Sequence, residues 1–133
     1  MPHPSDGDSR AWQRAMHLAD EIYLLSHRLP TAERFGLQAR LRRSAVSVVA
    51  NIAEAGDRLT LREYRFFLGV ASASLRELGE LMDGAAPLLP LGDDRLRRAR
   101  RLVDDIAEEL WSLDPSTPEA SLTAWLSDAK FRG

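Results

Sequence analysis

Apolar residues recur at intervals of three and four along this 133-residue chain, which is the period of an amphipathic helix. The first predicted helix begins at a cap supplied by Asp8 or Ser9. It ends at Pro30, because the residue before a proline is pushed out of helical geometry. Its inner stripe consists of Trp12, Ala15, Ala19, Ile22, Ser26 and Leu29.

The second predicted helix, Leu37 to Gly56, separates its side chains into two faces. The apolar face consists of Leu37, Leu41, Ala45, Val48, Val49 and Ile52. A separate polar face consists of Arg40, Arg43, Ser44, Ser47, Asn51 and Glu54. A helix with small polar residues in place of Lys and Glu is expected to contact neighbours on more than one side.

Two further helices are predicted after a short connection at Gly56 and Asp57. Thr60 followed by Glu63 has the form of a capping box and starts the third helix, which extends to Ala85. A cap from Asp93 or Asp94 starts the fourth. The main seam of the third helix is Tyr64, Phe67, Leu68, Ala71, Leu75, Leu78 and Met82, with a second apolar strip at Phe66, Val70 and Leu81. The seam of the fourth is Leu96, Ala99, Val103, Ile106, Leu110 and Leu113.

Four apolar seams joined by short connections predict an all-α protein, an antiparallel up-and-down four-helix bundle. No segment shows the sustained alternation of a half-buried strand. The expected division of the chain is a disordered N-terminal tip at residues 1–8, the bundle at 9–113, and a proline-rich linker with a short tail helix at 114–133.

Composition narrows the function classes. Apolar residues make up 44% of the chain, charged residues 29%, and the formal net charge is −2. The chain has no cysteine, so it has no disulfide and no thiolate metal site. No apolar run approaches the roughly 20 residues of a membrane span, and the N-terminal residues lack the apolar core of a signal peptide. We therefore expect a cytoplasmic protein without membrane contact, in which nucleic-acid binding would require a local basic patch.

The motifs of common enzymes are missing from the sequence. There is no Glu-x-x-His pair of a di-iron bundle, no phosphate-binding glycine loop and no nucleophile elbow. His17 and Glu21 lie one turn apart, and we interpret them as an ordinary surface pair. The sequence predicts a protein that is not an enzyme and that has no catalytic residue, cofactor or metal.

The arginines are the only functional side chains that form clusters along the sequence. One group, Arg40, Arg42 and Arg43, opens the second helix, and another, Arg58, Arg62 and Arg65, follows its end. In an antiparallel pair these groups would lie far apart. A third group in the fourth helix is followed by acidic residues that can pair with it. Two interpretations stay open: a solvated face of salt bridges, or an arginine surface for phosphates.

The strip formed by Ser44, Ser47, Asn51 and Glu54 also has two interpretations. An exposed strip would need no explanation. A buried strip would need partners, because an unpaired buried polar group costs about 1–3 kcal/mol. We favour a contact with another helix or another subunit, since small polar residues beside alanines allow close packing.

The segments LPTAERFGLQARLRRSAVSVVANIAEAGDR and EYRFFLGVASASLRELGEL resemble the signature of a bacterial four-helix-bundle family. Some members are encoded in intervening sequences of ribosomal RNA genes, and the accessory variability protein of diversity-generating retroelements is related. The resemblance implies a homopentamer that associates with RNA, DNA or a ribonucleoprotein such as a reverse-transcriptase-like protein. The matching positions are Pro30, Glu33, Arg34, Gly36, Arg42, Arg43, Ser44, Ser47, Asn51, Glu54 and Arg58.

Two hypotheses follow. The first is a non-enzymatic oligomeric bundle that binds RNA or a ribonucleoprotein through Arg40, Arg43, Arg58, Arg62 and Arg65. The second is a protein–protein interaction scaffold without nucleic-acid binding, whose arginines pair with carboxylates of adjacent subunits.

Overall fold

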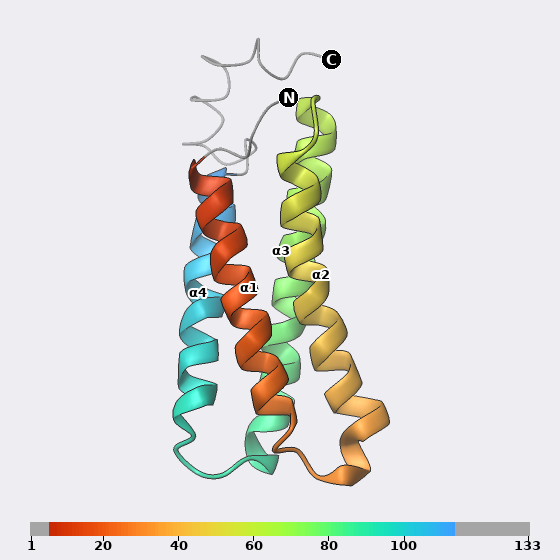
Figure 1. Cartoon of the computed structure of the whole chain (residues 1–133), viewed down its shortest axis with the longest axis vertical. Coiled ribbons are helices and arrows are strands. Elements are labelled where there is room, and N and C mark those ends of the chain that lie inside the picture. Colours follow the sequence, from red (N-terminus) through yellow and green to blue (C-terminus); the bar gives the residue numbers. More distant parts are fainter. Residues whose placement is uncertain (1–5, 114–133) are drawn as a thin grey trace.

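The computed structural model describes residues 6–113, which contain four α-helices and no strand (Figure 1). The helices are α1 (Asp6–Ser26), α2 (Ala39–Gly56), α3 (Leu61–Ala85) and α4 (Asp94–Leu113). They run alternately up and down, so the prediction of an all-α four-helix bundle is confirmed for this part of the chain. The predicted linker and tail helix at 114–133, and the first five residues of the predicted tip, lie outside the described residues.

Two predicted helix starts are wrong by a few residues. α1 begins at Asp6, ahead of the expected cap at Asp8 or Ser9, so residues 6–8 belong to the helix and not to the tip. α2 begins at Ala39 instead of Leu37, because a π-helical turn, η2 (Arg34–Gln38), precedes it.

The connections between helices are short and locally bonded. A 3-10 turn, η1 (Thr31–Glu33), leads into η2, and the Gln38 side chain donates from Nε2 to the Ser26 carbonyl at 2.9 Å. That bond satisfies a carbonyl that the end of α1 leaves free. Thr60 caps α3 as predicted, with Oγ1 accepting from the Glu63 amide at 3.2 Å. A second 3-10 turn, η3 (Ala86–Leu88), ends the α3 segment.

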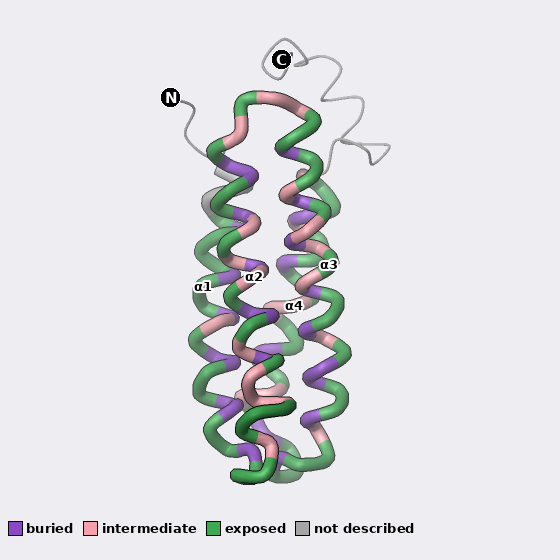
Figure 2. Tube along the Cα trace, turned by 90° about the vertical axis from the view of Figure 1, so that its right-hand side faces the viewer, coloured by how far each residue is buried: buried purple, intermediate pink, exposed green. Residues whose placement is uncertain are grey.

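The core lies between the four helices, and buried residues recur along their inner sides (Figure 2). Among the neighbouring helices, the α2–α3 pair is packed most extensively and the α3–α4 pair least. The largest buried side chains are Leu18, Ile22, Leu25, Leu41, Val48, Ile52, Leu68, Leu78, Met82, Ile106 and Leu110. These positions belong to the predicted seams or directly flank them.

None of the described helices is both long enough and apolar enough to cross a bilayer. Each helix has its buried apolar residues on the inner side and mostly polar residues on the outer side, which is the pattern of an amphipathic helix.

Candidate nucleic-acid interface

The predicted arginines lie in two groups at opposite ends of the α2–α3 pair. Arg40 and Arg43 are on the first turns of α2, and Arg58 follows its last residue. At 1.5 Å per residue, Arg43 and Arg58 are about 22 Å apart along the helix axis. Arg62 and Arg65 are on the first turns of α3, beside Arg58. The five candidates therefore form two surfaces.

The first surface surrounds an open hollow of about 540 Å³ on the outer side of α2. We call it the arginine hollow. It is lined by Tyr23 from α1, by Arg40, Arg42, Arg43, Ser44, Val46 and Ser47 from α2, and by Ser74 and Glu77 from α3. It thus joins two predicted candidates, Arg40 and Arg43, to two residues of the predicted contact strip, Ser44 and Ser47.

Arg42 is held in place within the hollow. Its Nε donates to Ser26 Oγ at 2.8 Å, and its guanidinium carbon lies 4.8 Å from the centroid of the Tyr23 ring. A cation over an aromatic face is attracted by the ring quadrupole. The sequence placed Arg42 in this group but did not include it among the binding candidates, because its neighbours on α1 are 16 and 19 residues away in the chain.

Arg40 and Arg43 are less constrained. Arg40 Nη2 lies 3.8 Å from Glu77 Oε1, and both side chains are more than half exposed, so this pair contributes little. Arg43 is exposed and makes no ion pair or hydrogen bond within residues 6–113. The hollow therefore carries three arginines against one carboxylate, with one guanidinium entirely available.

The second surface is more nearly neutral. Arg58 donates from Nη2 to Glu54 Oε2 at 2.5 Å, lies 3.8 Å from Glu63, and covers the Phe67 ring at 5.1 Å. Arg62 and Arg65 are exposed and have no ion pair within the described chain. Glu54, Glu63 and the nearby Asp57 match the three arginines in number, so the net charge here is balanced.

The polar strip of α2 is divided between two kinds of contact. The Ser44 hydroxyl is buried and donates to the Ser74 carbonyl of α3 at 2.8 Å, and the hydroxyls of Ser47 and Ser74 lie 2.7 Å apart. Asn51 donates from Nδ2 to the Ser47 carbonyl at 2.8 Å within α2, and Glu54 pairs with Arg58. The two serines therefore reach a neighbouring helix, whereas Asn51 and Glu54 bond locally.

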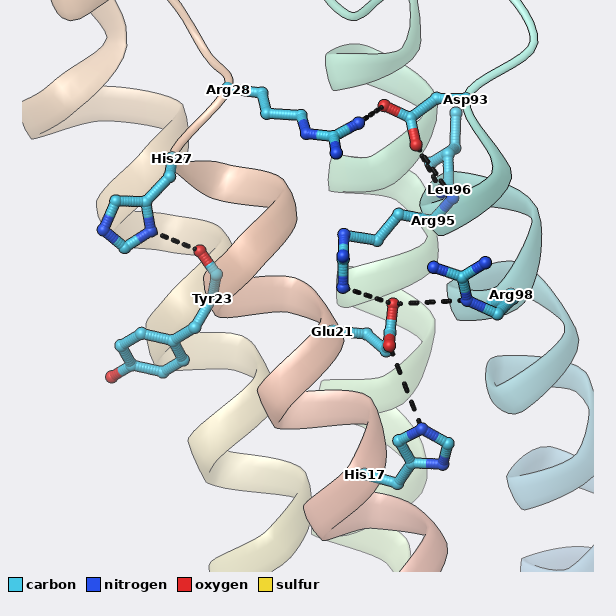
Figure 3. Close-up of polar contacts among 9 residues, drawn as sticks. All are labelled: His17, Glu21, Tyr23, His27, Arg28, Asp93, Arg95, Leu96 and Arg98. Carbon is cyan, nitrogen blue, oxygen red and sulfur yellow. Dashed lines mark hydrogen bonds and ion pairs between the residues drawn. The ribbon is translucent and has the colours of Figure 1, made fainter.

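A charged cluster between α1 and α4 was not expected from the sequence (Figure 3). Asp93 caps α4, with Oδ1 accepting from the amides of Arg95 at 2.8 Å and Leu96 at 3.3 Å. Its Oδ2 accepts from Arg28 Nη1 at 2.6 Å. Burial by itself raises the pKa of the Asp93 carboxyl, but these hydrogen bonds and the Arg28 charge outweigh it and lower the pKa below its usual value.

Glu21 is the second buried carboxylate of this cluster. Its Oε2 accepts from Arg95 Nη1 at 3.2 Å and lies 3.8 Å from Arg98 Nε, while His17 Nε2 lies 3.9 Å from Oε1 (Figure 3). The carboxylate predicted to pair with His17 is thus surrounded mainly by arginines of α4. Within residues 6–113, no three His, Cys, Asp or Glu side chains gather where they would hold a metal ion.

A family model described as "23S rRNA-intervening sequence protein" matches residues 7–112, which include nearly all of the described bundle. No curated protein matches the chain.

Proposed function

We propose a function for this chain, which belongs to the 23S rRNA-intervening sequence protein family. It associates with RNA through the arginine hollow and has no enzymatic role. The name of the family links its members to ribosomal RNA genes. The hollow is the surface of the described bundle where the candidate arginines most exceed their carboxylate partners.

The unpartnered guanidinium of Arg43 carries this proposal. It lies beside Arg40, whose only ion pair in residues 6–113 is a loose and exposed one, and beside Arg42, which is fixed on Tyr23. Guanidinium groups bind phosphate oxygens through paired hydrogen bonds, and releasing counterions from RNA supplies the free energy. A local surface of this kind can bind RNA although the whole chain is slightly acidic.

We also propose that the protein self-associates, with a homopentamer as the specific form. The support is an apolar strip on the outer surface of α1 at Trp12 and Met16, which are 39% and 40% exposed and do not line the hollow. These two residues are four positions apart and so share one face of the helix. An apolar strip at helical spacing is typical of a surface that another chain covers.

The test of RNA association uses fluorescence anisotropy with a mixed-sequence RNA pool between about 50 and 200 mM salt. The hollow variant is Arg40→Gln with Arg43→Gln. The control is Arg76→Gln with Arg101→Gln, which removes the same charge from exposed arginines that have no ion pair in the described bundle.

We expect the logarithm of the wild-type affinity to fall linearly with the logarithm of salt. The hollow variant should bind more weakly, with a slope shallower by about 1.4 if each arginine contacts one phosphate of a single strand. The control should keep most of the wild-type slope. Absence of wild-type binding at the lowest salt, or equal losses in both variants, would refute the proposal.

A further inference from the structure

Phe66 is an exposed aromatic residue that the core does not use. It lies on the second turn of α3, near the α2–α3 connection, and 62% of its surface is exposed. The sequence placed it in an apolar strip with Val70 and Leu81, but Leu81 is buried and Phe66 is not. A phenylalanine ring that is this exposed leaves apolar surface in water.

The Phe66 ring is supported from one side. It packs against Phe67 in an edge-to-face arrangement, with centroids 5.1 Å apart and planes at 84°. Phe67 in turn packs on the core and carries the Arg58 guanidinium over its face. Because a neighbour anchored on both sides holds the Phe66 ring, a ligand that stacks on it would lose little side-chain entropy.

Two arginines without an ion pair in the described residues lie beside this ring, on a surface whose nearby Glu63 lies 3.8 Å from Arg58. Arg62 precedes Phe66 by one helical turn and so lies on the same face, and Arg65 is its chain neighbour. Neither arginine has an ion pair or hydrogen bond within the described residues. A Cβ placed on Gly69 would meet no atom within 4 Å, so the surface one turn further along α3 is open. An aromatic face beside free cations matches a nucleotide, which has a flat base and a negative phosphate.

We infer that the RNA this protein binds is single-stranded, with an unpaired base stacked on Phe66 and the adjoining phosphates on Arg62 and Arg65. The inference rests on the proposed RNA association and adds the class of RNA and a second contact point. Bases in a duplex are stacked on one another and cannot offer a face to Phe66. The hollow and Phe66 together give one strand contacts at both ends of the α2–α3 pair.

The test compares a single-stranded oligouridylate with an RNA duplex of equal length. The variants are Phe66→Leu, which removes the ring, and Phe66→Tyr, which keeps it. Trp111→Leu is the matched control, because Trp111 is 60% exposed but lies on the acidic half of α4. Circular dichroism checks that each variant is folded, and light scattering gives its mass.

We expect the wild type to bind the single strand more tightly than the duplex. Phe66→Leu should weaken single-strand binding about tenfold, within the range for loss of one stacked base, and should change duplex binding little. Phe66→Tyr and Trp111→Leu should bind the single strand as the wild type does.

Three results overturn the inference. If Phe66→Leu binds the single strand like the wild type while the Arg40 and Arg43 variant is weakened, Phe66 is not a platform, although RNA association stands. If the wild type binds no RNA, both proposals fail. If Phe66→Leu lowers the mass of the assembly, a second copy of the chain covers the ring instead of a base.

Discussion

Replacing Asp93 with alanine should destabilise the bundle because one buried carboxylate performs two tasks. It accepts hydrogen bonds from two free amides in the first turn of α4, and it binds Arg28, which lies two residues after the end of α1. Only 1% of the Asp93 side chain is exposed, compared with 47% for Arg28. The substitution therefore takes a buried acceptor away from the α4 amides. It also takes the carboxylate away from Arg28, which water can solvate again.

The magnitude follows from these two tasks. Loss of a helix N-cap costs about 1 kcal/mol of unfolding free energy. Loss of the ion pair adds about 1 kcal/mol, near the upper value for exposed pairs, because the half-exposed Arg28 regains water. Asp93→Ala should therefore lower the free energy of unfolding by about 2 kcal/mol. Asp93→Asn keeps a capping oxygen and should lose about half of that amount.

Urea unfolding at a fixed protein concentration measures these differences. Asp94→Ala is the matched control, since Asp94 is the next residue and is 71% exposed, and it should cost less than about 0.5 kcal/mol. In an Arg28→Ala background, Asp93→Ala should cost only the cap, about 1 kcal/mol. An equal cost in both backgrounds would show that Asp93 and Arg28 are not coupled.

Two further predictions concern pH and assembly. The pKa of Asp93 is lowered in the folded state, so the ionised carboxylate stabilises the fold fully above its usual pKa of about 3.8, and this stabilisation is lost as the pH falls through the lower folded pKa. The difference in unfolding free energy between wild type and Asp93→Asn should be constant from pH 7 to about 5 and shrink below about 4. A difference that grows in acid would contradict the assigned direction. Met16→Glu, in the apolar strip, should reduce the mass measured by light scattering, whereas Met16→Leu should keep it; an unchanged mass for Met16→Glu would exclude the strip as an assembly surface.

The helices could be predicted from the sequence because their causes are local. Helical period located the seams, and Thr60 and Asp93 cap the helices that their sequence positions indicated. The start of α2 could not be placed correctly, because the π-helical turn before it has no distinct pattern of apolar residues.

The parts of the site that could not be predicted depend on residues far apart in the chain. Glu21 meets Arg95 across 74 positions, and Ser44 meets Ser74 across 30. Arg58 pairs with Glu54 one turn before it, a spacing that the sequence shows, whereas only the packed bundle shows that Arg43 has no partner within residues 6–113. The sequence identifies the arginines as candidates for phosphate binding, and the ion pairs in the structure show which of them are available.

An even number of antiparallel helices brings the first and last described residues to one end of the bundle (Figure 1). The arginine hollow lies toward the other end, whereas Phe66 lies near the end where the chain enters and leaves. Bulky groups attached near residue 6 or residue 113 would therefore lie at the same end as the aromatic platform and away from the hollow. An untagged protein free in solution is the appropriate material for comparing the two surfaces.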